Sequence, residues 1–227
     1  MYESLRSGKR IWIGHCLLLY GPFFIEAIYS LIIKHFEEPS AYWFFGMYFL
    51  LCYLFYGAVC AIHITWRKKI GETVIFRYVP NGIVWIAISV FIGIAGSKMG
   101  QIMLYGYVFS PMIVRDVYAY FIRFSPRAIG AVGFTLQYIY YCFEFTLITV
   151  LVDCIQKTSE KYALCQKIPW GGLFLALTWG IGHAITKNNI QDGLYSALMS
   201  LPIGIVYLLP ENKRLNTWCA AAAIYFL

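Results

Sequence analysis

Long apolar segments separated by short polar ones follow one another along the whole chain. An α-helix needs about 20 predominantly apolar residues to cross the hydrocarbon core of a bilayer. The pattern therefore predicts an all-α fold, a polytopic membrane helical bundle of about six to seven transmembrane helices, in a single membrane domain over residues 1–227. The expected spans cover residues 11–33, 41–66, 82–95, 129–152, 169–185 and 193–209, and a shorter apolar run occupies 215–227.

Residues 96–127 interrupt this regularity. SKMGQ breaks the apolar run, and the stretch QIMLYGYVFSPMIV after it has the character of a half-span or a re-entrant segment. RDVYAYFIRFSPR mixes arginines with aromatic rings, which both favour the headgroup region, and is typical of an interfacial amphipathic segment. The pattern leaves these alternatives open.

The composition agrees with a membrane protein. Hydrophobic residues make up 60% of the chain and charged residues 13%, whereas a soluble domain has about 25% charged residues. The net charge of +7 predicts contact with anionic membrane lipids rather than with nucleic acid, because basic residues in so apolar a chain belong to cytoplasmic loops.

Basic residues lie on alternate sides of the expected spans. The positive-inside rule therefore predicts a cytoplasmic N-terminus. The opposite segments, KHFEEPS and TKNNIQD, carry fewer cations. The basic segments contain Arg6, Lys9, Arg10, Arg67, Lys68, Lys69, Arg77, Lys157, Lys161, Lys167, Lys213 and Arg214.

Ionisable side chains inside apolar spans are the first candidates for function, because their burial in a membrane is costly. Glu26 and His15 share one helical face about 16 Å apart along the axis, so they could line one cavity but cannot touch. A structural hydrogen bond is the equal alternative for Glu26. His63 is expected at the interface, and Asp153 is expected to be solvated at the cytoplasmic end of its span.

Glu144 and His183 are the strongest candidates. Glu144 lies among the aromatic residues of YIYYCFEFTLITV, and His183 lies in the apolar stretch LTWGIGHAI of the next span. A carboxyl and an imidazole in such positions can exchange protons with a substrate. The structural alternative is a glutamic acid that hydrogen-bonds to neighbouring helices, together with a structural histidine.

The order of elements in residues 128–227 resembles the family of CAAX proteases and bacteriocin-processing enzymes, also called the abortive-infection family. A span with Glu144 is followed by the basic loop KTSEKYALCQK and by a span that begins with IPWGG and ends with LTWGIGH. The resemblance implies a bacterial intramembrane peptidase in which Glu144 and His183 activate water. Trp179 fits the family's aromatic-to-histidine motif, and Glu26 and His15 are further candidates for substrate binding or for support of the catalytic pair.

The chain departs from the family pattern where the chemistry is expected. The family has two adjacent glutamates followed by an arginine, whereas Glu144 stands between Phe143 and Phe145. The family's second histidine and its asparagine or aspartate have no counterpart in TWCAAAAIYFL. Loss of one oxyanion donor alone costs about 10² to 10³ in rate. A catalytically inactive relative, acting as a membrane scaffold or as an immunity or partner-binding subunit, is therefore the alternative to a peptidase.

A transporter or channel subunit is a third and weaker hypothesis, because no inverted repeat supports it. We expect no cofactor and no metal, since the sequence has neither an HExxH motif nor a CxxC pair among its seven cysteines. The expected partners are membrane lipids and either a peptide substrate or a transmembrane partner protein.

Overall fold

The computed structural model describes residues 2–33, 41–70, 82–122, 127–162, 164–210 and 212–226. These residues form α-helices, one short π-helix and connecting turns, with no β-strand among them, so the predicted all-α fold is confirmed. The elements are α1 (Tyr2–Ile33), α2 (Ala41–Lys69), α3 (Gly82–Tyr105), α4 (Met112–Val117), η1 (Tyr118–Ile122), α5 (Arg127–Lys161), α6 (Trp170–Lys187), α7 (Ile190–Tyr207) and α8 (Lys213–Phe226).

Part of the charge pattern used to predict the orientation lies outside the described residues. This applies to the segments 34–40, 71–81 and 123–126 and to the side chains of residues 2–11. The cytoplasmic position of the N-terminus therefore stays a prediction.

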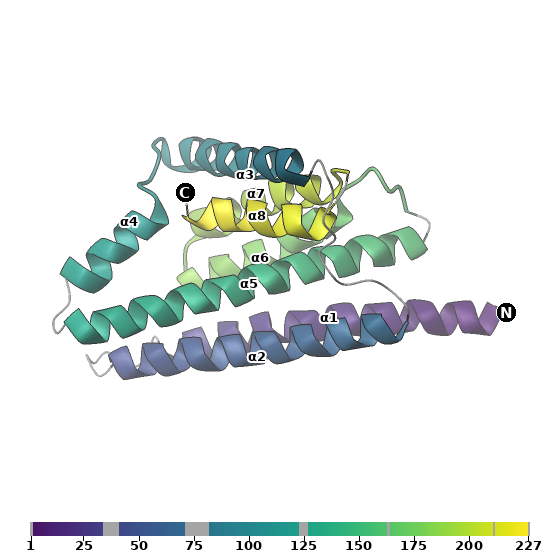
Figure 1. Ribbon diagram of the computed structural model, residues 1–227, viewed down its shortest axis with the longest axis horizontal. Coiled ribbons are helices and arrows are strands. Elements are labelled where there is room, and N and C mark those ends of the chain that lie inside the picture. The colour runs from purple at the N-terminus through teal and green to yellow at the C-terminus, as the bar shows by residue number, and fades with distance from the viewer. Residues whose placement is uncertain are drawn as a thin grey trace.

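The central element is α5, which has 35 residues and is roughly 50 Å long at 1.5 Å per residue. It packs against α1, α2, α6 and α8. Figure 1 shows α5 between the pair formed by α1 and α2 and the group formed by α3, α7 and α8. Side chains on several sides of α5 can therefore meet partners that are distant in sequence.

The α6–α7 hairpin is closely packed because glycines lie at the helix crossing. A Cβ added at Gly172 of α6 would come 2.7 Å from the Cα of Gly204 of α7, and small residues allow this approach of two backbones. Asn188 forms the turn in the left-handed conformation, with a φ of 51°, which asparagine tolerates well. The Asn189 side chain then accepts the Gln191 N–H and caps α7.

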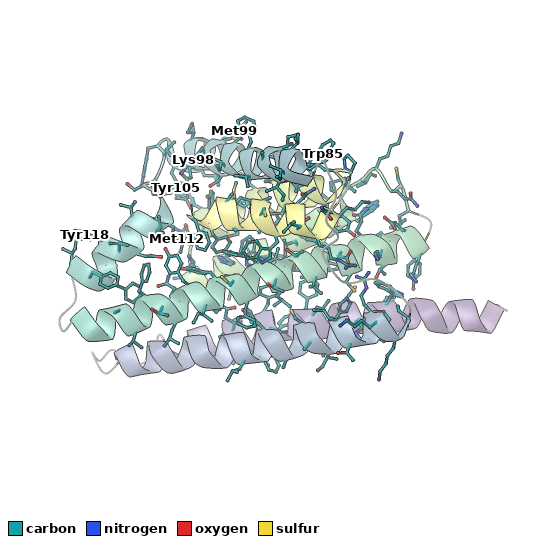
Figure 2. All side chains as sticks on the ribbon, in the orientation of Figure 1. Trp85, Lys98, Met99, Tyr105, Met112 and Tyr118 are labelled. Carbon is teal, nitrogen blue, oxygen red and sulfur yellow. The ribbon has the colours of Figure 1, made fainter. Side chains whose placement is uncertain are left out.

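Two helices in the described part of the chain are long and apolar enough to cross a membrane: α3 and residues 130–161 of α5. The α3 window is only 22% buried, against 72% for α5. α3 exposes large apolar side chains, among them Ile83, Phe91 and Met99, and Figure 2 shows Met99 on its outer side. An apolar surface of this kind marks an interaction site, and lipid chains would cover it, so these helices support association with a membrane.

α3 continues through SKMGQ to Tyr105, whereas the sequence indicated an interruption after residue 95. The polar side chains do not end the helix because they face α7. The Ser97 and Tyr195 hydroxyls lie 2.8 Å apart, and the Gln101 side-chain amide donates to the Tyr195 oxygen at 3.2 Å. The rest of the irregular segment contains the short helices α4 and η1.

We predict that Gly172→Ala lowers the free energy of unfolding by about 1–3 kcal/mol, because the added methyl group overpacks a contact between two backbones. Gly182→Ala is the matched control in the same helix, since nothing lies within 4 Å of a Cβ added there. The control should keep or raise stability, by up to about 1 kcal/mol. Unfolding in mixed micelles followed by circular dichroism measures both variants, and equal midpoints would contradict the close packing.

Candidate functional site

Carboxylates from two helices meet three tyrosines inside the bundle. Glu26 of α1 accepts hydrogen bonds from the Tyr56 hydroxyl of α2 and, at 2.6 Å, from the Tyr140 hydroxyl of α5. Glu144, one turn further along α5, accepts from the Tyr225 hydroxyl of α8 at 3.0 Å. Tyr140 lies one turn before Glu144 on α5. This tyrosine–carboxylate network therefore joins α1, α2, α5 and α8.

The Glu144 side chain is enclosed by aromatic rings. It is 3% exposed, and the neighbouring Phe145 ring contacts the Tyr225 ring edge-on, with the ring centroids 4.8 Å apart. A buried carboxyl group needs hydrogen-bond donors from the protein, and the Tyr225 hydroxyl supplies one. The structure thus places Glu144 as a hydrogen-bond acceptor between helices.

His183 has different neighbours. Its Nδ1 lies 3.1 Å from the carbonyl oxygen of Trp179, one turn earlier in α6. The Trp179 ring meets the His183 ring edge-on at 4.8 Å and stacks on Tyr225 at 5.9 Å. Among the described side chains, no hydrogen bond joins Glu144 to His183, and the contacts between them pass through Tyr225 and Trp179.

A cavity of about 530 Å³ lies between α1 and α6 and is lined by Glu26, Trp179 and His183. The remaining wall is mainly apolar, and the volume is in the range that small ligands occupy. The structure therefore brings three of the five candidate residues to one cavity, while Glu144 and His15 are not among the residues that line it.

His15 lies against α2 instead. Its ring stacks on Trp66 with the centroids 3.8 Å apart and lies 5.4 Å from the His63 ring. His63, which we expected near the interface, is buried at 1% exposure. In the described part of the chain, no three His, Cys, Asp or Glu side chains are grouped to hold a metal ion.

A buried ion cluster on α5 is not evident from the sequence. Asp153 is 2% exposed; it pairs with Arg67 of α2, lies 3.2 Å from Arg214 and accepts from the Tyr207 hydroxyl at 2.6 Å. The expectation that Asp153 is solvated is therefore wrong. Two arginines that we assigned to loops reach the carboxylate, and pairing of this kind is what permits a charge to be buried.

Comparisons with known proteins do not assign a family. No protein-family model, no curated protein and no solved structure matches this chain. The resemblance of residues 128–227 to the CAAX proteases stays a prediction, and the interpretation of the site depends on its own geometry.

We predict that Asp153→Asn lowers the free energy of unfolding by about 3–5 kcal/mol, because Arg67 is then buried without its counter-charge. Glu160→Gln is the control: it also replaces a carboxylate of α5 by an amide, about two helical turns after Asp153, and its side chain is partly exposed. That control should change stability by less than about 0.5 kcal/mol. Denaturant unfolding of both variants measures their free energies of unfolding. Equal losses of stability would show that the buried ion cluster contributes no more than an exposed carboxylate does.

Proposed function

We propose that this chain is a multi-pass integral membrane protein that holds an apolar peptide segment or a transmembrane helix of a partner between α1 and α6, without cleaving it. One observation carries the proposal: the two candidate catalytic side chains have separate partners. Glu144 is bonded to tyrosine inside the bundle, and His183 lines the cavity.

The membrane setting is supported by the helices themselves. α3 and most of α5 have the length and apolar character of spans, and residues 12–28 of α1 form a further, shorter apolar helix. The apolar segments of the sequence extend this to a multi-pass arrangement in which membrane lipids cover the outer faces. The charge pattern favours a cytoplasmic N-terminus, and the resemblance to the CAAX-protease core suggests a bacterial cell membrane.

The cavity suits an apolar occupant. Phe24 of α1 and Ile181 and Ile185 of α6 line it and are exposed on the surface of the chain, so an apolar group can reach it from the lipid side. Glu26 and His183 add polar groups to the same wall. Pockets of this composition bind through apolar contact and use a few polar groups to fix orientation.

A peptidase of the CAAX type is the second candidate function, and a specific observation favours it. Glu26 and His183 line one cavity, and Glu26 accepts from the Tyr140 hydroxyl, one turn before Glu144 on α5. In this alternative a carboxylate of the network acts as the base for water and His183 stabilises the oxyanion. The missing family motifs count against it.

We predict that a benzophenone side chain introduced at Ile181 captures a partner of discrete mass in native membranes. The same group at Ile205, which is exposed on α7 and does not line the cavity, is the control and should capture no such partner. Gly182→Leu should abolish capture at Ile181, because the space beside Gly182 is open and the new side chain fills it.

The mass of the captured partner distinguishes binding without cleavage from peptidase activity. If the protein only binds, wild type and His183→Ala capture a partner of equal mass. A peptidase gives a shortened product in the wild type and an intact partner in His183→Ala. Failure to capture anything specific at Ile181 would contradict both functions.

A further inference from the structure

Two cysteines on different helices are in contact inside the bundle. The Sγ atom of Cys16 on α1 lies 2.9 Å from the Sγ atom of Cys154 on α5, although the two residues are 138 positions apart in the sequence. Both are free thiols. Figure 1 shows the N-terminal part of α1 running along the C-terminal part of α5, and the two helices pack against each other. The fold therefore brings together two thiols that no sequence spacing relates.

Neighbouring groups hold the two sulfur atoms in place. The Cys154 thiol donates to the backbone carbonyl oxygen of Trp12, one turn before Cys16 on α1, at 3.8 Å. The Thr158 hydroxyl donates to the carbonyl oxygen of Cys154 at 2.7 Å, and its oxygen lies 3.5 Å from the Cys16 sulfur. The sulfur atoms of a disulfide are about 2.05 Å apart, so these two need to approach each other by less than about 1 Å to form a bond.

The two thiols differ in their exposure. Cys154 is 0% exposed, whereas Cys16 is only partly buried. The pair also lies near an accessible end of the bundle. Lys161, about two turns after Cys154 on α5, is exposed, and its ammonium group lies 4.6 Å from the centre of the Trp12 ring. Because oxidation of cysteine follows exposure, a small neutral oxidant should react first with Cys16, and Cys154 then lies directly behind it.

We propose that Cys16 and Cys154 form a reversible oxidation site, at which a hydroperoxide such as hydrogen peroxide converts the two thiols to a disulfide. The Cys16 sulfur attacks one peroxide oxygen, the O–O bond breaks, and the other oxygen leaves as water with the thiol proton, which gives a sulfenic acid. The Cys154 sulfur then attacks the Cys16 sulfur, the S–O bond breaks, and a second water leaves. Two thiols are oxidised and one hydrogen peroxide is reduced to two water molecules.

The disulfide would connect α1 covalently to α5. Cys16 lies one turn before Tyr20, which lines the cavity between α1 and α6 and accepts from the Thr178 hydroxyl of α6 at 3.0 Å. Oxidation therefore ties one wall of this cavity to the central helix. The charge pattern favours a cytoplasmic position for this end of the bundle, where thiols are kept reduced between oxidation events. The inference does not rest on the proposed partner binding, because it depends only on the contact between the two thiols.

Peptide mapping tests the proposal on the full chain in detergent micelles. Hydrogen peroxide is added until Cys165, which is exposed between α5 and α6, is oxidised. The remaining thiols are blocked with N-ethylmaleimide, and the peptides are analysed by mass spectrometry with and without dithiothreitol. We expect a linked pair of peptides that contain Cys16 and Cys154, and loss of this pair after reduction by thiol–disulfide exchange. Oxidised Cys165 together with unlinked Cys16 and Cys154 in the folded wild type would overturn the proposal.

Variants then test the order of the two reactions. In C154S the sulfenic acid of Cys16 has no thiol to condense with, so dimedone should label Cys16 more strongly than in the wild type. In C16S the buried Cys154 should not be labelled. C165S is the control and should form the linked peptides as the wild type does. Circular dichroism shows whether each variant is folded; if C154S is not, the mapping of the wild type decides alone. Equal dimedone labelling of Cys16 in the wild type and in folded C154S would overturn the proposed role of Cys154.

Discussion

Two carboxyl groups are buried on α5, and a buried carboxyl group is stable only when it has hydrogen-bonding or ionic partners. These partners lie on other helices, so the packing of those helices against α5 depends on them. Glu144 is bonded to Tyr225 of α8, and Asp153 is paired with Arg67 of α2 and with Arg214 of α8. An unpartnered carboxylate at either position would carry the full cost of desolvation. α8 contacts both carboxyl groups, which lie nine residues apart on α5, so the two contacts together fix its position along α5, whereas α2 is held through Asp153 alone.

Glu144 lies outside the lining of both cavities, the one between α1 and α6 and a second one among α3, α4, α7 and α8. Its hydrogen bond to Tyr225 places an aromatic pair, Tyr225 and Trp179, between it and His183. The open space lies instead on the two sides of α6, and Trp179 and His183 contribute to both cavities. The cavity between α1 and α6 has a mainly apolar wall.

The sequence predicts the helices well and their side-chain partners poorly, for physical reasons. Apolar segment length and helical spacing identify most of the helices, because both properties are local. The extension of α3 past residue 95 could not be predicted, since Ser97 and Gln101 are satisfied by Tyr195, which is distant in sequence. Glu144 and His183 could be singled out as ionisable groups in apolar surroundings, but no sequence period shows which tyrosine turns towards Glu144. The resemblance of residues 128–227 to the CAAX-protease family stays a prediction.

The central claim is that Glu144 serves as a buried acceptor for Tyr225, and a double-mutant cycle tests it most directly. Free energies of unfolding in mixed micelles are measured for Glu144→Leu, Tyr225→Phe and the double variant. We predict a coupling energy of about 1–3 kcal/mol, and no coupling between Glu144→Leu and Tyr118→Phe, whose side chain is exposed on η1 (Figure 2). Additive losses for Glu144 and Tyr225 would contradict the account and would favour a Glu144 side chain that is available for chemistry.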